Sequence, residues 1–225
     1  MPKAVYSVMG MTLGIDFDNT IVNYDQVLYK AALEAGLIKP GAEKNKKGIR
    51  DSIRKLPDGE LQWQRLQAHV YGRGMKDSVL SEGVKAFFDA CRAAAIRVAI
   101  VSHKTQFASM DEGGVNLRDT ALRWMREKRF FDSDGLGLSP ESVYFESTRR
   151  EKIERIKSLG CTHFIDDLEE TFLEEAFPAG VERILYAQKS SSLKGVKAFG
   201  SWKEIYDYFF AGSRQPGQSR YSLHR

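Results

Sequence analysis

Two carboxylates separated by one residue, Asp16 and Asp18, follow directly after the apolar stretch of residues 11–15. Side chains two positions apart in an extended segment project to the same side. Neighbouring carboxylates repel each other, so they stay together only where a cation or a shared proton offsets the repulsion. The pair therefore indicates a reactive site, although an Asp-x-Asp sequence taken alone also fits a solvated turn.

Three later features place polar side chains in comparable positions. One apolar run ends at Ser102, and another ends at the pair Asp166 and Asp167. Lys152 lies between these runs, at the start of a helical pattern. In a parallel sheet the carboxyl ends of the strands open on one edge, where ligands bind at the switch in strand order. We therefore expect hydroxyl, lysine and acid pair to meet the first two carboxylates there.

This ordered set resembles the motifs of the haloacid dehalogenase superfamily of phosphohydrolases. The first motif of that superfamily is Asp-x-Asp-x-Thr followed by an apolar residue, matched here by Asp16, Asp18, Thr20 and Ile21. The remaining motifs match in order at Ser102, at Lys152 and at the pair Asp166 and Asp167. Each motif is short, but the ordered set is specific, and the resemblance spans roughly residues 11–210.

The resemblance implies a phosphatase that forms an aspartyl phosphate. Asp16 would be the nucleophile, and Asp18 would protonate the leaving oxygen and then take a proton from water. Ser102 would bind a phosphate oxygen, and Lys152 would screen the charge of nucleophile and phosphate. If that lysine is only a surface residue, two arginines could replace it: Arg149 and Arg150.

The resemblance also implies a magnesium ion. Mg²⁺ is a hard cation that prefers oxygen ligands, and it would offset the charge that a phosphoryl group adds to several carboxylates. Its ligands would be Asp16, the backbone carbonyl of Asp18 and one residue of the pair Asp166 and Asp167. We favour Asp167 as the direct ligand, because relatives often have Gly or Glu before the ligating Asp; Asp166 would then orient water or the lysine.

Substrate contacts are expected near the motifs and in the segment that follows the first motif. Asn19 tolerates the left-handed backbone that a tight turn needs, and His103 is expected to border the site as a loop residue. The residues predicted to bind substrate are Asn19, Thr20, His103 and Lys104 near the motifs, and Trp63, His69 and Tyr71 further away. The two aromatics of the second group also fit the apolar core of a helical domain.

The pattern downstream of residue 80 alternates helix and strand, which predicts an α/β fold with a parallel sheet covered by helices on both faces. Strands are expected at residues 11–15, 96–101, 143–145, 162–165 and 183–186, and helices around residues 84–95, 117–125, 152–159, 169–176 and 202–209. The resemblance implies that this is the Rossmann-like core of the haloacid dehalogenase type.

Residues 23–80 lack this alternation. Asp25 is expected to be the N-cap of a helix through Ala35, ended by Gly36, and a second helix is expected at residues 61–70. The superfamily inserts its cap at this position. We therefore expect a core of residues 1–22 and 81–211, a helical cap of residues 23–80 and a disordered tail of residues 212–225.

Composition narrows the class of protein. The chain has 225 residues and a net charge of +4, of which three arginines in residues 212–225 contribute +3, leaving +1 for the rest. That balance does not favour a nucleic-acid partner. No run approaches the ~18 apolar residues of a membrane span, and the N-terminus does not fit a signal peptide. We expect a cytoplasmic enzyme with a small phosphorylated substrate, and two reduced cysteines, Cys91 and Cys161.

Several questions stay open at the level of sequence. The basic run that includes Lys44, Lys46 and Lys47 fits a solvated face or a positive rim that attracts phosphorylated substrates. Transfer of the phosphoryl group to a second hydroxyl, as in phosphomutases, is an alternative to hydrolysis. A binding module without turnover is a further alternative. Substrate identity, with sugar phosphates and nucleotide-like compounds both possible, and oligomeric state do not follow from the sequence.

Overall fold

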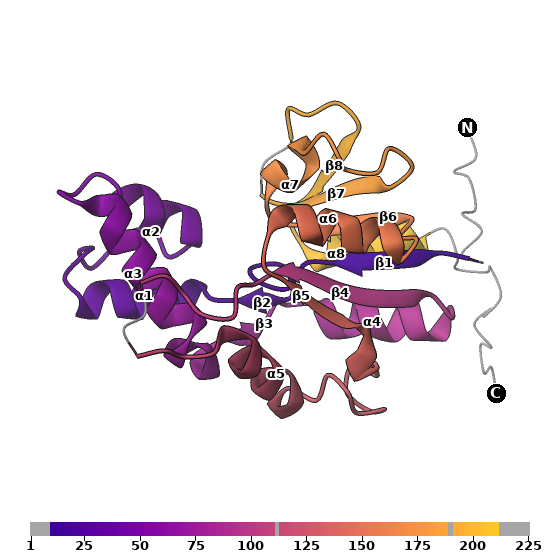
Figure 1. Ribbon diagram of the computed structural model, residues 1–225, viewed down its shortest axis with the longest axis horizontal. Coiled ribbons are helices and arrows are strands. Elements are labelled where there is room, and N and C mark those ends of the chain that lie inside the picture. Colours follow the sequence, from indigo (N-terminus) through magenta and orange to yellow (C-terminus); the bar gives the residue numbers. More distant parts are fainter. Residues whose placement is uncertain (1–9, 111–112, 189–190, 212–225) are drawn as a thin grey trace, which may run out of the picture.

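A six-stranded parallel sheet forms the centre of the computed structural model, which describes residues 10–110, 113–188 and 191–211 (Figure 1). The strand order is β5-β4-β1-β6-β7-β8. The strands are β1 (Thr12–Ile15), β4 (Arg97–His103), β5 (Val143–Glu146), β6 (His163–Asp166), β7 (Glu182–Tyr186) and β8 (Val196–Phe199). The predicted parallel α/β sheet is confirmed, and β8 is an additional strand. The predicted disordered tail, residues 212–225, lies outside the described residues.

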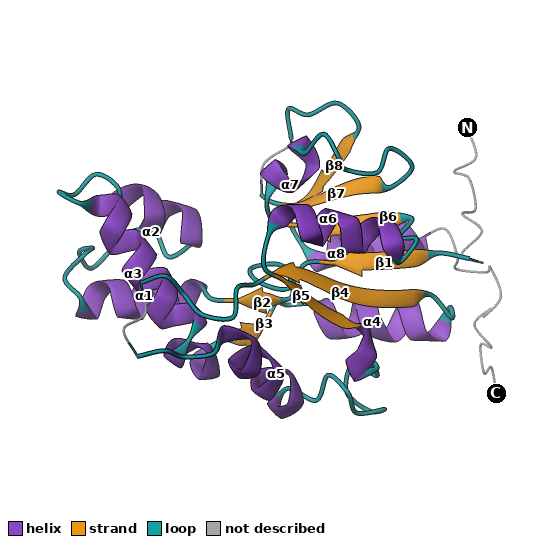
Figure 2. Cartoon of the chain, viewed as in Figure 1, coloured by secondary structure: helices purple, strands orange, loops and turns teal. Residues whose placement is uncertain are grey.

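Helices cover both faces of this sheet, as Figure 2 shows. One face packs against α4 (Val84–Ala93) and α8 (Trp202–Phe210), and the other against α6 (Arg149–Ser158) and α7 (Glu169–Leu173). A further helix, α5 (Leu117–Glu127), follows β4, and two short 3₁₀ helices span Arg73–Asp77 and Pro140–Ser142. The helix predicted at residues 169–176 is α7, which ends at Leu173 and is shorter than expected.

Alternation along β1 divides its side chains between these two faces. Leu13 and Ile15 are fully buried in the core on the side of α4 and α8. Gly14 points the other way, where an added Cβ would lie only 2.5 Å from the ring of Phe164. The absence of a side chain at Gly14 therefore lets β1 and β6 pair closely, and the residue two positions later, Asp16, continues on that same side.

Residues 23–80 form a helical segment that contributes no strand to the six-stranded sheet. Its helices are α1 (Asp25–Glu34), α2 (Lys46–Ile53) and α3 (Gly59–Tyr71). Figure 1 shows them beyond the carboxyl ends of the sheet strands. Two short antiparallel strands, β2 (Val22–Asn23) and β3 (Val79–Leu80), join this segment to the rest of the chain. Helix α2 was not predicted.

The start of α1 differs from the prediction. The N-cap is Tyr24, which makes no side-chain cap hydrogen bond, and Asp25 is the first residue of the helix. The Asp25 carboxylate instead accepts a hydrogen bond of 2.8 Å from the backbone N–H of Lys46. The assignment of Asp25 as N-cap is therefore wrong, because this carboxylate joins α1 to the start of α2.

Two smaller expectations concern bilayers and thiols. No helix in the described part of the chain combines the length and hydropathy that a bilayer span requires. Cys91 and Cys161 are free and buried, and burial raises the pKa of both thiols, to about 12 and about 11. Both therefore remain protonated thiols at neutral pH, as expected for structural residues.

Candidate active site

The predicted site residues meet at the carboxyl edge of the sheet, on both sides of β1. Asp16 follows β1, Ser102 lies near the end of β4 and Asp166 ends β6. β4 and β6 flank β1, with Ile15 in register with Ile100 on one side and with Ile165 on the other. The strand order changes direction at this point, since β4 and β5 extend the sheet one way and β6 to β8 the other. Ligands bind at such switch points in open parallel sheets.

Phe17 fixes the direction of the two carboxylates beside it. Its ring is fully buried and makes edge contacts with Trp124, Phe130 and Phe145, at centroid distances of 5.9, 6.3 and 6.1 Å. Because Phe17 points into this aromatic cluster, Asp16 and Asp18 face away from it and line a cavity. Asn19 then turns the chain with φ of 60°, the left-handed conformation that the sequence predicted.

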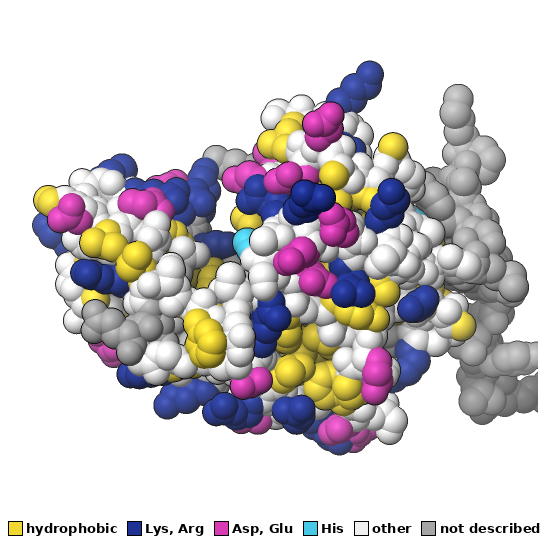
Figure 3. Space-filling view, viewed as in Figure 1, with side chains coloured by type: hydrophobic (Ala, Val, Ile, Leu, Met, Phe, Trp, Pro, Cys, Tyr) yellow, Lys and Arg dark blue, Asp and Glu magenta, His cyan; other side chains and the backbone are white. Residues whose placement is uncertain are grey.

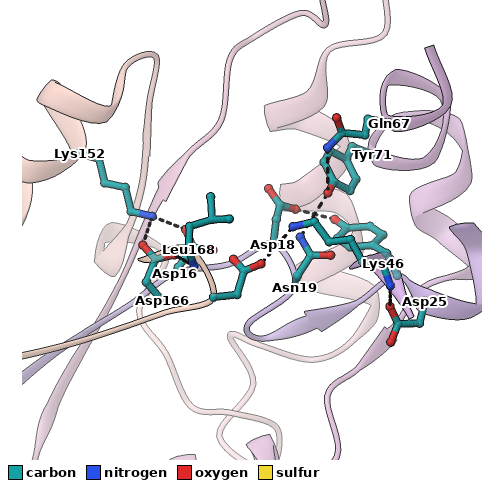
Figure 4. A network of polar contacts seen from close by, with 12 residues as sticks. Asp16, Asp18, Asn19, Asp25, Lys46, Gln67, Tyr71, Lys152, Asp166 and Leu168 are labelled. Atoms are coloured by element: carbon teal, nitrogen blue, oxygen red, sulfur yellow. Dashed lines mark hydrogen bonds and ion pairs between the residues drawn. The ribbon is translucent and has the colours of Figure 1, made fainter. Parts of the chain in front are cut away.

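Lys152 joins the carboxylates that follow β1 and β6. Its Nζ lies 2.6 Å from Oδ1 of Asp16 and 2.8 Å from Oδ2 of Asp166 (Figure 4). A capping box formed by Thr148 and Glu151 starts α6 and places Lys152 on its first turn. The ammonium therefore lies in the position that the lysine motif predicted.

The two arginines considered as substitutes are paired elsewhere. Arg150 forms an ion pair with Glu154 on the surface of α6, and Arg149 pairs with Glu174. Arg149 also lines the cavity, although the structure shows no ion pair between it and Asp16. Lys152 is thus the residue that contacts the candidate nucleophile.

The charges of this buried pair depend on competing effects. Burial raises the pKa of Asp16 to about 8, opposed by the charge of Lys152 and reinforced by Asp166 and Asp167. Burial acts to lower the pKa of Lys152, but the charges of Asp16 and Asp166 outweigh it and hold that pKa above its usual value. The lysine therefore remains an ammonium, and the site has an excess of carboxylates that favours a further cation.

Asp18 is held by two donors. Tyr24 donates its hydroxyl to Oδ1 at 2.6 Å, and Nζ of Lys104 lies 3.1 Å from Oδ1 and 2.9 Å from Oδ2. Burial and the charge of Asp18 raise the pKa of Tyr24 well above its usual value, so the phenol keeps its proton and acts as a donor. Tyr24 and Lys104 together orient the Asp18 carboxylate at the cavity.

Asp166 and Asp167 occupy different environments. Both oxygens of Asp166 are used within the protein, one by Lys152 and the other by the backbone N–H of Leu168 at 2.9 Å. Asp167 lines the cavity, and its Oδ2 lies 3.0 Å from Nζ of Lys46 in α2. Burial raises the pKa of Asp167, while Lys46 opposes that shift.

Three of these carboxylates could hold a metal ion. Asp16, Asp166 and Asp167 each offer an oxygen, and these oxygens all lie within 4.8 Å of one another. A set of hard oxygen donors suits Mg²⁺ rather than the softer transition metals. The side chain of Asp18 lies outside this group.

Two buried hydroxyls lack a hydrogen-bond partner within the described residues: Thr20 Oγ1 and Ser102 Oγ. A buried polar atom without a partner costs about 1–3 kcal/mol, so such an atom commonly marks a place where a ligand or water binds. Ser102 lines the cavity beside Asp16 and Lys152. Thr20 is fully buried and does not line it.

The cavity has a volume of about 390 Å³ and lies between the carboxyl edge of the sheet and the helical segment. Figure 3 shows the two parts as lobes separated by a notch with Lys or Arg side chains along it. The predicted residues that line the cavity are Asp16, Asp18, Asn19, Tyr71, Ser102, His103, Lys104, Lys152 and Asp167. Lys46, which the sequence named only as part of the basic run, also lines the cavity, and the polar side chains missed by the prediction are Gln64, Gln67, Thr105, Ser109 and Thr171.

Helix α3 presents a different face to the cavity than predicted. Trp63 is 2% exposed and packs in the apolar core, and His69 is exposed and does not line the cavity. The structure therefore does not bring these two side chains to the cavity with the other predicted substrate-binding residues. The cavity face of α3 carries Gln64, Gln67, Ala68 and Tyr71, which follow the spacing i, i+3, i+4 and i+7. That spacing of polar residues was the available signal.

His103 borders the site as expected, but it is the last residue of β4 and not a loop residue. Its Nε2 lies 3.0 Å from the backbone carbonyl oxygen of Ser147, so this nitrogen is the donor. Burial lowers the pKa of the imidazole, which favours the neutral form. The backbone after β5 thus holds the imidazole ring. The ring forms no hydrogen bond with Ser102, whose hydroxyl has no partner among the described residues.

Solved structures of hydrolases of the haloacid dehalogenase superfamily share this fold. A haloacid dehalogenase-like hydrolase of Streptococcus pneumoniae is 14% identical with a TM-score of 0.55, covering 88% of this chain and 98% of its own. A family hydrolase of Deinococcus radiodurans, solved with bound phosphate and sodium, is 16% identical with a TM-score of 0.50, covering 89% of this chain and 95% of its own.

A similar structure also occurs in a protein with a different name. The protein tyrosine kinase A of Mycobacterium tuberculosis is 14% identical with a TM-score of 0.58, covering 89% of this chain and 98% of its own. No protein-family model matches the sequence, and no curated protein matches it either. The likeness to the solved hydrolase structures shows that the chain has a fold of the haloacid dehalogenase type, as the motifs predicted.

Proposed function

We propose that this protein is a magnesium-dependent phosphomonoester hydrolase that forms an aspartyl phosphate from a small phosphorylated metabolite. The observation that carries this proposal is the buried Ser102 hydroxyl, which has no partner among the described residues and lines the cavity with Asp16 and Lys152. A phosphate oxygen would satisfy that hydroxyl, and the same phosphate would place its phosphorus near the Asp16 carboxylate.

The first half of the reaction transfers the phosphoryl group to Asp16. A carboxylate oxygen of Asp16 forms a bond to phosphorus, the bond from phosphorus to the ester oxygen breaks, and Asp18 gives a proton to that leaving oxygen. Lys152 Nζ lies 2.6 Å from Asp16 Oδ1 and therefore orients the attacking carboxylate. Charge on the transferred oxygens would be stabilised by Lys152 and by the Ser102 hydroxyl.

The second half releases inorganic phosphate. Water attacks the phosphorus while Asp18 accepts its proton, and the bond from phosphorus to Asp16 breaks, which restores the carboxylate. Tyr24 and Lys104 hold Asp18 in place, with Tyr24 donating at 2.6 Å. A carboxylate at this position thus has the support that a proton carrier needs between the two halves.

Magnesium fits the donor set of this site. Asp16 and Asp167 line the cavity with oxygens close enough to share one ion, while Asp166 already uses both its oxygens within the protein. We therefore propose Asp16, Asp167 and the backbone carbonyl of Asp18 as ligands. When bound, the ion would offset the charge of the carboxylates and of the phosphoryl group.

We also propose that residues 23–80 act as a cap over a core of residues 1–22 and 81–211. The cavity face of α3 carries Gln64, Gln67 and Tyr71, and the Tyr71 hydroxyl accepts a hydrogen bond of 3.2 Å from Nδ2 of Asn19 beside the catalytic carboxylates. A leaving group bound beside Asp16 would meet these side chains. Amides both donate and accept hydrogen bonds, as the hydroxyls of a sugar or polyol do, so this face supports a sugar phosphate more than a nucleotide.

The test is release of inorganic phosphate from a panel of phosphorylated metabolites, with Mg²⁺ and without any acceptor. Hydrolysis by the wild-type protein, its loss on chelation, and a phosphorylated Asp16 trapped with borohydride would support the proposal. Transfer only when an acceptor hydroxyl is added would favour a phosphotransferase. Binding of phosphorylated compounds without turnover would favour a binding module.

A further inference from the structure

Lys46 forms a direct contact between the helical segment and the catalytic edge. Its Nζ lies 3.0 Å from Oδ2 of Asp167, although 121 positions separate the two residues. The side chain of Lys46 is 20% exposed and that of Asp167 is 13% exposed. In α2 Lys46 is the residue that lines the cavity. This ion pair thus lies at the place where the proposed metal and substrate would meet.

The backbone of Lys46 is fixed from two directions. Its N–H donates to Asp25 in α1 at 2.8 Å, and the side chain of Asn45 caps the helix by accepting from the N–H of Gly48 at 2.7 Å. The four-carbon side chain can still adopt other rotamers from this fixed point. Lys46 can therefore change its partner at the cavity without a movement of α2.

Lys46 carries a charge that needs a partner at this site. The Asp167 carboxylate, 3.0 Å away in a largely buried position, balances that charge. A partly buried ammonium without a counter-ion is costly. A divalent cation at the carboxylates of Asp16 and Asp167 would also repel an ammonium in contact with one of its ligands.

We propose that Lys46 is an exchangeable counter-ion, paired with Asp167 in the absence of a divalent cation and with anionic oxygens of the phosphorylated substrate once a cation holds Asp167. This inference rests on the proposed function and adds a substrate-binding residue from the helical segment to it. Through this exchange Lys46 and Asp167 each have an opposite charge beside them before and after ligands bind. Binding of the metal ion thus releases Lys46 from Asp167 and makes its ammonium available to the substrate.

The exchange predicts effects of opposite sign for one substitution. Lys46→Met removes a cation that competes for Asp167, so Mg²⁺ alone should bind about tenfold more tightly. The same change removes a charged donor to phosphate, so inorganic phosphate should bind about tenfold more weakly in the presence of saturating Mg²⁺. A side chain that only supports the fold would weaken both ligands together.

The experiment is isothermal titration calorimetry of the full-length protein with MgCl₂ and then with inorganic phosphate. Lys47→Met is the matched control, because Lys47 is exposed on the same helix and its loss changes the net charge equally. The control should change either dissociation constant less than twofold. Lys46→Gln is a second variant with a polar side chain, and circular dichroism checks that each variant is folded.

The outcomes separate this inference from the proposed function. Tighter Mg²⁺ and weaker phosphate in both Lys46 variants support the exchange, even if no phosphomonoester is hydrolysed, in which case only the proposed function fails. Unchanged constants, or changes of the same sign for both ligands, overturn the exchange even if the wild-type protein is an active phosphatase. A wild-type protein that binds no Mg²⁺ overturns it as well.

Discussion

Nζ of Lys152 lies 2.6 Å from Oδ1 of Asp16, although 136 positions separate the two residues. Each is held by a different element, since Asp16 follows the central strand β1 and Lys152 lies in the first turn of α6. The contact thus depends on the pairing of β1 with its neighbours in the sheet and on the packing of α6 against β4 and β5. The orientation of the candidate nucleophile is a property of the whole core.

Replacing Asp16 by Asn should reduce phosphatase turnover below about a hundredth of the wild-type rate. The change removes the nucleophilic charge with almost no change in volume, and Lys152 keeps Asp166 as a partner. We therefore expect an unchanged circular dichroism spectrum. Phosphate release measures the effect, with Asp132→Asn, an exposed carboxylate paired with Arg129, as control. Higher residual turnover would exclude Asp16 as nucleophile.

Asp166 and Asp167 should respond differently to substitution by Ala. Asp167→Ala should weaken Mg²⁺ binding more, by at least about tenfold, because Asp167 lines the cavity and Asp166 already uses both oxygens. Asp166→Ala should instead lower the stability of the metal-free protein by about 1–3 kcal/mol, since the backbone N–H of Leu168 loses its acceptor. Calorimetry and thermal unfolding measure the two effects. The reverse order would exchange the two roles.

Mg²⁺ affinity should rise with pH through the neutral range. In the metal-free protein burial raises the pKa of Asp16 to about 8, so this carboxyl holds a proton below that pH, and the ion binds the ionised form. Each pH unit below about 8 should weaken binding by up to about tenfold, and the effect should level off above it. Titrations in buffers of different ionisation enthalpy count the released proton. In Asp16→Asn the dependence should disappear, and a flat wild-type profile would contradict the protonation of Asp16.

The two faces of α3 should separate substrate choice from stability. Gln67→Ala should change the order of preference among phosphorylated metabolites while hydrolysis of a small aryl phosphate stays within about threefold, because Gln67 lines the cavity and its Nε2 lies 3.5 Å from the Tyr71 hydroxyl rather than beside a catalytic carboxylate. Trp63→Ala should lower the free energy of unfolding by about 3–5 kcal/mol, because Trp63 is 2% exposed in the core. Equal losses of Gln67→Ala on every substrate would assign that residue to the chemistry.

The carboxyl edge could be predicted from the sequence because its signals are local. Asp16 and Asp18 flank a buried Phe17, so strand alternation alone gives their common direction. Ser102 and Asp166 follow apolar runs, which identify the ends of strands. Lys152 was placed by motif order alone, and its contact with Asp16 requires the fold.

The cavity side of the helical segment was harder to predict because its signals are weak or depend on tertiary contacts. Helix α2 starts in a basic run with few apolar residues, and its hydrophobic contacts come from Ile49 and Ile53 alone. Nothing local distinguishes Lys46 from Lys44 or Lys47, because its role depends on Asp167 across the cavity. In α3 the aromatic residues are the more prominent signal in the sequence, whereas the spacing of Gln64, Gln67 and Tyr71 marks the cavity face.

The central position of β1 has a consequence for how the chain folds. β1 is the first strand of the sheet, yet its neighbours are β4 and β6, whose paired residues begin at Arg97 and His163. Closing such long loops is slow, and strands that pair late stay exposed to aggregation during folding. On the ribosome β1 emerges first and must wait without its second neighbour until β6 has been made. The carboxylates of Asp16 and Asp166 meet only then, so a growing chain acquires its charge-dense edge late, after most of the hydrophobic core is available to hold it.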